Sequence, residues 1–283
     1  MKIEINQTRC IKCLRCVRVC PAHIFYLNKE TKEVQTQKEE SCISCGHCAA
    51  ACLDRAVVHE LFPEEKIHQV DRSLLPTPEQ MDLLIKVRRS NRAFTSQPVP
   101  REYLEQILEA AYRTPTASNE QELKFIITSN PDKIRAISQI TLDYFGALIK
   151  KLKPLMPIVK HILPREVKMI PQFEAMQKEF EKGNDLILRG ATTVLFIYTH
   201  KKARFGIQDA NLAYQNASLM AESLGISQFY TGFVYNAIKN DKKHRIEKLL
   251  GIEGTIYAGM GLGMPAFLFE QYPDKKPADI RWV

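Results

Sequence analysis

All eight cysteines of this 283-residue chain lie between Cys10 and Cys52. They form two runs with one spacing, in which three cysteines are separated by two residues each and a fourth follows after three more: Cys10, Cys13, Cys16 and Cys20, then Cys42, Cys45, Cys48 and Cys52. Three thiolates at this spacing can wrap one [4Fe–4S] cubane, while the fourth points toward a second cluster. The pattern therefore predicts crossed ligation, with one cluster held by Cys10, Cys13, Cys16 and Cys52 and the other by Cys20, Cys42, Cys45 and Cys48.

Two other uses of cysteine fit these runs poorly. Disulfides need an oxidising compartment, and the opening Met1-Lys2-Ile3-Glu4 is not an apolar run followed by a small-residue cleavage site. Structural zinc sites use cysteine pairs rather than triplets with a fourth cysteine at a fixed offset. His47 lies inside the second run, where we expect a surface spacer and not a ligand.

Composition limits the remaining functions. Hydrophobic residues make up 45% of the chain and charged residues 25%, which is typical of folded domains rather than disordered ones. The formal net charge is +8, but no zinc finger, RNA-binding signature or interleaved basic-aromatic pattern indicates nucleic-acid binding. The apolar stretch at 193–198 is too short to cross a bilayer. We expect a cytoplasmic protein with no transmembrane segment and no nucleic-acid partner.

The cysteine-rich segment resembles a bacterial-type two-cluster ferredoxin over about 60 residues, which we assign to residues 1–62. Pro21 follows the first run as in that family, whereas Leu53 takes the place of proline after the second. The resemblance implies short strands at 22–26 and 56–60 beside the clusters. Because so small a domain has little core, the clusters would supply much of its folding energy.

Residues 63–80 form a predicted linker, and the pattern of a larger domain follows it. Thr77, Pro78 and Gln80 form a helix start with a capping box, and a second helix begins near Pro100. Apolar runs predict strands at 124–128, 192–198, 228–233 and 255–261, with helices at 206–224 and 240–250 between them. This alternation predicts an α+β architecture with helices around a sheet.

Two motifs of the larger domain resemble the nitroreductase family of FMN enzymes: 88–94, Arg-Arg-Ser-Asn-Arg-Ala-Phe, and 115–121, Pro-Thr-Ala-Ser-Asn-Glu-Gln. The glycine-rich 259–265 and a late Lys-Lys-Pro at 275–277 extend the resemblance over residues 81–283. It implies a nitroreductase-type α/β sandwich with a mixed central sheet and surrounding helices, bound FMN, and a homodimer with FMN at the subunit interface.

The same resemblance implies the cofactor-binding residues. Arginine suits the FMN phosphate because its planar guanidinium makes paired, charge-assisted hydrogen bonds. The residues expected to bind FMN are Arg88, Arg89, Ser90, Arg92, Pro115, Thr116, Ala117, Asn119, Gln121, Thr231, Gly232, Lys275 and Lys276. Asn119 would bond the flavin ring, and Thr231 and Gly232 would present a backbone N–H to its N5. No side chain is expected to act as a catalytic acid or base.

Simpler interpretations compete with these assignments. An arginine pair is often a solvated helix end, and glycines 259, 261 and 263 can serve close strand packing. Residues 143–185 mix apolar residues with lysines and prolines, so we expect short helices broken by proline. This insert is either a lid over the flavin, a subunit or membrane contact, or a solvated excursion.

Together these features predict an iron–sulfur flavoprotein oxidoreductase. Its clusters would take electrons from a one-electron donor protein or from a reduced nicotinamide cofactor, and FMN would deliver a hydride to an electron-poor acceptor such as a nitroaromatic, quinone or enone. Two other hypotheses remain at this stage: an electron-transfer or redox-sensing flavin module without small-substrate turnover, and a flavin-modifying enzyme of the same superfamily.

Overall fold

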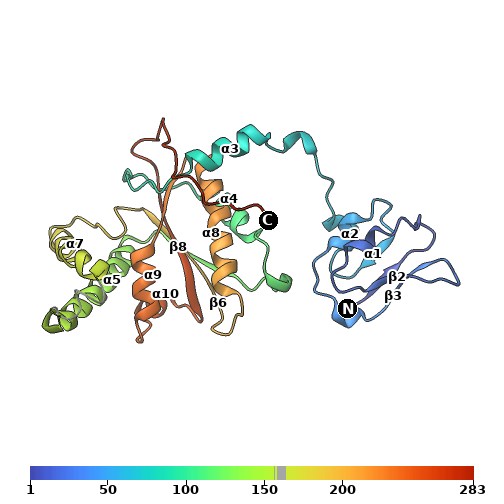
Figure 1. Ribbon diagram of the computed structural model, residues 1–283, viewed down its shortest axis with the longest axis horizontal. Helices are drawn as coiled ribbons and strands as arrows, with labels where there is room; N and C mark the ends of the chain where they lie inside the picture. Colours follow the sequence, from blue (N-terminus) through green and yellow to red (C-terminus); the bar gives the residue numbers. More distant parts are fainter. Residues whose placement is uncertain (156, 158–163) are drawn as a thin grey trace. The chain divides into compact units, whose positions relative to one another are not determined.

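The computed structural model describes residues 1–155, 157 and 164–283, which form two compact units (Figure 1). Unit 1 contains residues 1–76 and a short later segment, 116–120. Unit 2 contains residues 77–115 and 121–283. Each unit has its own hydrophobic core and is described by itself.

Unit 1 is built from four three-residue strands and two short helices, with single 3-10 turns between them. Its elements are β1 (Ile3–Ile5), α1 (Arg15–Val19), β2 (Phe25–Leu27), β3 (Val34–Thr36), η1 (Glu39–Ser41), α2 (His47–Ala51), β4 (Val57–His59), η2 (Glu64–Lys66), η3 (Arg72–Leu74) and, from the later segment, η4 (Ala117–Asn119). β1 pairs antiparallel with β4, and β2 pairs antiparallel with β3. α1 packs against α2, and each helix carries the third cysteine of its run.

One strand of unit 1 begins later than the sequence predicts. The expected strand at 56–60 contains β4, but the strand expected at 22–26 is β2 at Phe25–Leu27. After Cys20 the backbone turns: His23 donates its N–H to the Cys20 carbonyl at 3.2 Å, and Ile24 donates to Cys20 Sγ at 3.5 Å. The turn around the cysteine sulfur therefore delays the strand.

Unit 2 is a four-stranded sheet with helices on both faces. Its elements are α3 (Pro78–Val87), α4 (Arg101–Tyr112), β5 (Lys124–Thr128), α5 (Pro131–Leu152), η5 (Lys153–Leu155), α7 (Pro164–Glu181), β6 (Thr193–Thr199), α8 (Gly206–Ser223), β7 (Ser227–Tyr230), α9 (Gly232–Asn240), α10 (Arg245–Leu250) and β8 (Thr255–Gly263). The strand order is β5-β6-β8-β7. The α+β fold class is confirmed, but all three strand pairings in the described residues are antiparallel, so the expected mixed sheet is not seen there.

The central strand β6 shows why helices cover both faces. Val194 and Phe196 belong to the core formed with α5, α7, α9 and α10, whereas Leu195 and Ile197 belong to the core formed with α4 and α8. Alternate side chains of a strand point to opposite faces. All four are buried, so the apolar run requires a cover on each side.

The capping box of α3 forms as predicted, with Thr77 Oγ1 accepting from the Gln80 N–H and Gln80 Oε1 accepting from the Thr77 N–H. Two other predictions were wrong. The strand expected at 228–233 ends at Tyr230, and the helix expected at 240–250 begins only at Arg245, as α10. α9 starts at Gly232, and a turn around Asp241 separates it from α10; Asp241 accepts from the backbone N–H of Lys243 and Arg245.

The insert expected at 143–185 is less broken than its prolines indicate; its residues 156 and 158–163 lie outside the described residues. α5 runs unbroken to Leu152, and Pro171 lies inside α7. An internal proline costs a helix about 3 kcal/mol. Phe173, Met176 and Phe180 are buried along one face of α7, and each such burial contributes roughly 1.5–3 kcal/mol. Packing therefore offsets the cost of the proline.

Candidate functional site

The cysteines of unit 1 surround two separate small cavities. One is lined by Cys10, Cys13, Cys16 and Cys52. The other is lined by Cys20, Cys42, Cys45 and Cys48. Each cavity thus combines three cysteines of one run with the fourth of the other run, which is the grouping that crossed ligation requires.

The cavity walls suit a polynuclear cluster. Among the described residues, no group of three or more His, Cys, Asp or Glu side chains is arranged to hold one metal ion. Burial raises the pKa of the Cys16 thiol and raises that of Cys48 to about 12. Such thiols bind as thiolates when a metal holds them deprotonated. The cysteines therefore fit two [4Fe–4S] clusters.

Hydrogen-bond donors approach the sulfur of Cys42 from two sides. The Ser44 backbone N–H donates to Cys42 Sγ at 3.4 Å, and His59 Nε2 lies 3.7 Å from the same sulfur. His59 is 2% exposed, and burial lowers its pKa. Leu61 donates its backbone N–H to His59 Nδ1 at 3.2 Å, so the proton of the neutral ring resides on Nε2 and faces the sulfur.

The segment that carries Arg88 to Phe94 is held by buried side chains. Asn91, itself buried, donates its amide to the Phe267 carbonyl at 2.9 Å and accepts from the Ala93 N–H at 3.0 Å. Backbone hydrogen bonds from Thr95 to Met264 and from Ala266 to Ala93 fasten the segment beside the end of β8. Its polar residues therefore occupy defined positions.

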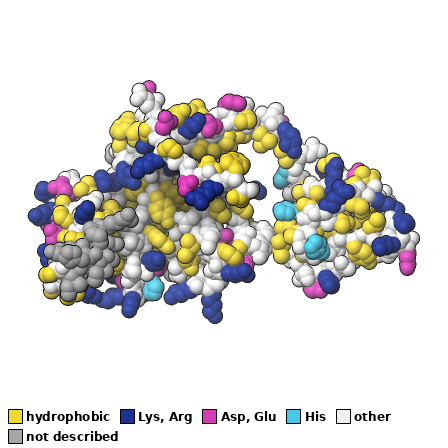
Figure 2. Space-filling view, in the orientation of Figure 1, with side chains coloured by type: hydrophobic (Ala, Val, Ile, Leu, Met, Phe, Trp, Pro, Cys, Tyr) yellow, Lys and Arg dark blue, Asp and Glu magenta, His cyan; other side chains and the backbone are white. Residues whose placement is uncertain are grey.

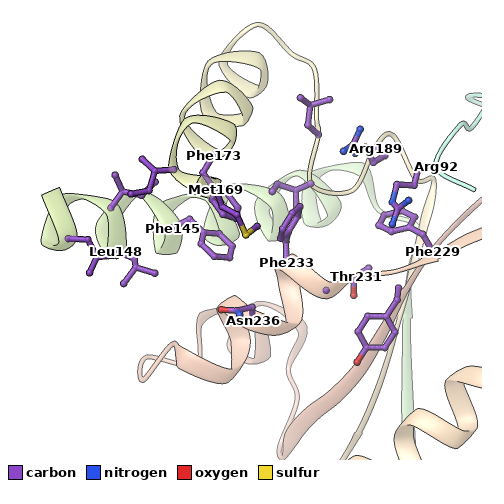
Figure 3. Close-up of a pocket in the computed structure, with 17 residues that line it drawn as sticks. Arg92, Phe145, Leu148, Met169, Phe173, Arg189, Phe229, Thr231, Phe233 and Asn236 are labelled. Carbon is purple, nitrogen blue, oxygen red and sulfur yellow. The ribbon is translucent and has the colours of Figure 1, made fainter. Parts of the chain in front are cut away.

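A cavity of about 590 Å³ opens beside this segment in unit 2 (Figure 3). Its lining includes Arg92, Thr231 and Gly232, three of the residues expected to bind FMN, together with Arg189. This volume lies within the usual range for small-molecule and cofactor sites. Three segments that are distant in the sequence therefore meet at one site.

Aromatic side chains form one wall of the cavity. Phe145 of α5 stacks on Phe173 of α7 with ring centroids 4.0 Å apart and planes at 16°. Phe233 of α9 meets both rings edge-on, with centroid distances of 5.2 Å to Phe173 and 6.1 Å to Phe145. The described part of the insert thus lines the cavity, and the aromatic rings there suit a flat, apolar ligand.

Positive charge lies at the end of the cavity that is opposite the aromatic wall. Figure 3 shows the side chains of Arg92 and Arg189 there, with Phe229 below Arg92. The Arg92 guanidinium carbon lies 5.5 Å from the Phe229 ring centroid, and no ion pair of the described residues includes Arg189. Figure 2 shows hydrophobic side chains beside Lys and Arg on one face of unit 2. The cavity is therefore apolar at one end and cationic at the other.

The start of α9 supplies backbone donors to the same cavity. Thr231 is its N-cap residue and makes no side-chain cap hydrogen bond. Thr231 Oγ1 is buried without a partner among the described residues, and Gly232 adds no side chain to the wall. The first N–H groups of a helix have no partner within the helix and favour electron-rich ligand atoms. These features fit the flavin edge that the sequence assigns to Thr231 and Gly232.

The structure does not bring every expected FMN residue to the cavity. Arg88, Arg89 and Ser90 belong to the fastened segment and do not line the large cavity. Arg89 faces Phe269, 5.3 Å from its ring centroid, beside a second, shallow cavity. The remaining residues are not among those that line the large cavity: Pro115, Thr116, Ala117, Asn119, Gln121, Lys275 and Lys276. The two lysines lie exposed in the irregular tail after β8. Their contacts with FMN stay predictions.

Asn119 makes contacts that the sequence did not indicate. Its side-chain amide donates to the Ile43 carbonyl at 3.1 Å and to the Ser44 carbonyl at 2.8 Å, both in the second cysteine run. Residues 116–120 belong to unit 1, so these are contacts within that unit. Both N–H groups of the amide are used, and neither is left to donate to a flavin in this arrangement.

Three residues at or beside the cavity of unit 2 were not indicated by the sequence. Tyr214 donates its hydroxyl to Gln228 Oε1 at 2.7 Å, and Gln228 donates its amide to the Arg89 carbonyl at 3.2 Å. Arg189 precedes β6 and faces the cavity. The only local signal was polarity inside apolar surroundings, at Gln228 in β7 and Tyr214 in α8.

Two known families match separate parts of the chain. The model of the 4Fe-4S dicluster domain matches residues 2–53, and that of the nitroreductase family matches residues 85–264. A Methanothermobacter thermautotrophicus protein whose name includes NAD(P)H nitroreductase is 28% identical over 191 residues, covering 66% of this chain and 79% of that protein. The FMN reductase [NAD(P)H] of Bacillus subtilis is 25% identical over 180 residues and covers 63% of each chain.

Solved structures show the same fold. A nitroreductase with bound FMN from Bacteroides fragilis superimposes with a TM-score of 0.54 at 21% identity, covering 72% of this chain and 98% of that one. The molecule is therefore an FMN-dependent oxidoreductase with an iron–sulfur domain, and its cofactors are FMN and [4Fe–4S] clusters. The chain belongs to the nitroreductase family. None of the helices in the described ranges has the length and apolar character of a membrane span.

Proposed function

We propose that this chain passes electrons from its two [4Fe–4S] clusters to FMN and reduces a planar, electron-poor acceptor, such as a nitroaromatic, a quinone or an enone. When bound, FMN supplies the exchange of one or two electrons and hydride delivery. The electrons would come from a one-electron donor protein or from a reduced nicotinamide cofactor. The names of the two curated relatives, which include NAD(P)H, support the nicotinamide as a partner.

The segment 115–121 carries the proposal of cluster-to-flavin transfer. By family resemblance this segment lines the flavin, and its residues 116–120 belong to unit 1. Asn119 in its centre is hydrogen-bonded to Ile43 and Ser44, between two cysteines of the second cluster. The family resemblance thus assigns to the flavin a segment that is hydrogen-bonded to the loop of the second cluster, and this supports the second cluster as the one that serves the flavin.

The residues of unit 2 have separate roles in this proposal. Arg88, Ser90 and Arg92 bind the FMN phosphate, and the start of α9 offers a backbone N–H to the reactive edge of the flavin ring. The rings of Phe145 and Phe173 pack against a flat acceptor and exclude water from the reacting atoms. This apolar wall favours turnover of a small acceptor over a carrier role without one.

Rapid kinetics on the anaerobic full-length chain test the electron path. In a Cys45→Ser variant, which lacks a ligand of the second cluster, we expect reduction of FMN by a one-electron donor to slow at least about tenfold, a barrier increase of roughly 1.4 kcal/mol. Reoxidation of chemically reduced FMN by a nitroaromatic should stay at the wild-type rate. Equal rates of FMN reduction in the two proteins would refute the path, and no reoxidation by any nitro, quinone or enone acceptor would favour the carrier.

We also propose a homodimer. After β8, the irregular tail of unit 2 exposes large apolar side chains: Phe267, Leu268, Phe269, Tyr272, Ile280 and Trp282. Exposed large apolar side chains in this number suit burial against a second copy of the chain. Trp282, the single tryptophan, is 94% exposed in one chain. Light scattering should give twice the chain mass, and dilution to monomers should shift the tryptophan emission to the red; a monomeric mass at all concentrations would exclude the dimer.

A further inference from the structure

The surroundings of the two clusters differ in hydrogen bonding. Around the second cluster, the Ile24 N–H donates to Cys20 Sγ at 3.5 Å. Cys42 Sγ accepts from the Ser44 N–H at 3.4 Å and lies 3.7 Å from His59 Nε2. Around the first cluster, the Ala56 N–H donates to Cys52 Sγ at 3.2 Å, and backbone N–H groups at Cys16 and Val17 face the Cys16 sulfur. Both clusters thus have backbone donors, but in the described chain only the second has a side-chain donor, His59.

Asn119 strengthens one of these donors. The Ile43 carbonyl and the Ser44 N–H are the two ends of one peptide group; the carbonyl accepts from Asn119 Nδ2, and the N–H donates to Cys42 Sγ. Hydrogen bonds in such a chain polarise one another. The second amide hydrogen of Asn119 holds the Ser44 carbonyl at 2.8 Å. The loop around Cys42 is therefore fixed from both sides of Ser44.

His59 has a defined orientation. Its Nδ1 accepts from the Leu61 N–H, and its ring lies edge-on to Phe62 with centroids 4.9 Å apart. The buried ring therefore directs Nε2–H toward the sulfur of Cys42.

We propose that these contacts make the two clusters unequal, and that the cluster held by Cys20, Cys42, Cys45 and Cys48 has the higher reduction potential. An added electron increases the negative charge on a cluster, and hydrogen bonds to its sulfurs stabilise that charge. His59 and Asn119 are the residues that tune it. One electron then passes from the first cluster, which is oxidised, to the second, which is reduced, with no bond or proton exchanged.

In the electron path, the cluster with the higher potential then comes directly before FMN, and this last step rests on the proposed function. The cluster whose loop is held by Asn119 collects the electron, and the other cluster receives it from the external donor. The potentials themselves do not depend on that step. A measurement of the clusters can therefore fail or succeed independently of electron transfer to FMN.

The test is a redox titration of the full-length anaerobic chain, followed by the electron paramagnetic resonance signal of the reduced clusters. The wild type should show two separate one-electron waves. In His59→Phe, which keeps a ring against Phe62 but removes the donor, the reduced-to-oxidised ratio of one cluster at a fixed potential should fall about tenfold, equal to ~59 mV for one electron. The wave that moves should be the more positive of the two.

Asn119→Gly provides a second variant that does not disturb the buried core of unit 1. Asn119 has a φ of 56°, which glycine adopts without strain. It should move the same wave in the same direction, by less than His59→Phe does. The matched control is His47→Phe, which changes an exposed histidine within the same cysteine run and should move neither wave.

Each outcome bears on the proposal. Two separate waves, of which only the higher moves in both variants, support it. A single wave for both clusters, movement of the lower wave, equal movement of both waves, or no movement in Asn119→Gly would each overturn it. Iron content of about eight atoms per chain, as two [4Fe–4S] clusters require, shows that a variant still holds both clusters.

Discussion

Tyr214 donates its hydroxyl to Gln228 at 2.7 Å, and Gln228 in turn holds the carbonyl of Arg89 at 3.2 Å. Gln228 is 1% exposed, so its amide has little access to water. Burial raises the pKa of Tyr214, which keeps the phenol protonated and able to donate. This pair connects the helix α8 and the strand β7 to the arginine segment that is proposed to bind the FMN phosphate.

Tyr214→Phe should therefore weaken both the fold and FMN binding. The variant leaves Gln228 Oε1 buried without its donor, which costs about 1–3 kcal/mol, and we expect the free energy of unfolding to fall by that amount. FMN affinity, measured by quenching of flavin fluorescence, should fall several-fold because the Arg89 backbone loses its fixed anchor. Tyr112→Phe on the exposed side of α4 is the control and should change neither quantity. Unchanged unfolding of Tyr214→Phe would show that the hydroxyl contributes nothing.

A second prediction concerns the close contact of β8 with the start of α9. A Cβ at Gly259 would lie 2.4 Å from Thr231 Oγ1 and 2.7 Å from the Phe196 ring. Gly259→Ala should therefore lower the free energy of unfolding by about 1–3 kcal/mol, as overpacking does, and should displace Thr231 and weaken FMN binding. Gly146→Ala is a matched control.

Gly146 lies inside α5, and a Cβ there would meet nothing within 4 Å. Alanine should stabilise the helix at that position by roughly 0.5–1 kcal/mol. Chemical denaturation of both variants at one protein concentration gives the comparison. Equal effects of the two substitutions would mean that the contact between Gly259 and Thr231 is easily relaxed.

The parts of this molecule that sequence could predict are those set by local spacing. The cysteines follow one another at fixed intervals, so their grouping into two clusters can be inferred without a structure, and the cavities of unit 1 show the same grouping. The capping box at Thr77 and Gln80 is equally local. The arginine motif could be recognised for the same reason, since its residues lie within one short segment.

The remaining features depend on packing between distant segments. Nothing near Arg189 in the sequence indicates that it faces the same cavity as Arg92. Asn119 lies 75 residues from Ser44, and its hydrogen bond there follows from tertiary structure alone. Pro171 was expected to end a helix, but the buried face of α7 outweighs that local preference. At each of these positions the structure depends on long-range contacts.

Removal of the clusters should unfold unit 1 and leave unit 2 folded. The buried core of unit 1 is small and includes Cys16 and Cys48 themselves, so metal binding contributes much of its folding free energy. After oxidative removal of iron, hydrogen exchange should accelerate in β1 to β4 while β6 and β8 keep their protection. Reconstitution with iron and sulfide should restore the slow exchange. Retained protection of β1 to β4 in iron-free protein would show that this core suffices without metal.

The last prediction concerns Arg189 at the cationic end of the cavity. No carboxylate among the described residues pairs with it, and it shares the cavity with Arg92 and the aromatic wall. Two cations beside an apolar surface favour a ligand that carries an anionic group. In Arg189→Gln we expect the KM of an acidic acceptor such as 4-nitrobenzoate to rise about tenfold, a loss of roughly 1.4 kcal/mol, because the charge-assisted contact is removed. The KM of the neutral 4-nitrobenzyl alcohol and both kcat values should stay unchanged.

Two controls separate this role from a contact with the cofactor. Arg113→Gln removes an arginine that pairs with Glu109 on the surface of α4 and should leave every KM unchanged. The dissociation constant of FMN should be the same in Arg189→Gln as in the wild type. If FMN binding weakens instead and the two acceptors respond alike, then Arg189 holds the flavin rather than the acceptor. A lysine at this position should restore much of the preference for the acid, since a single positive charge is enough to attract a carboxylate, although it cannot form the paired hydrogen bonds of a guanidinium.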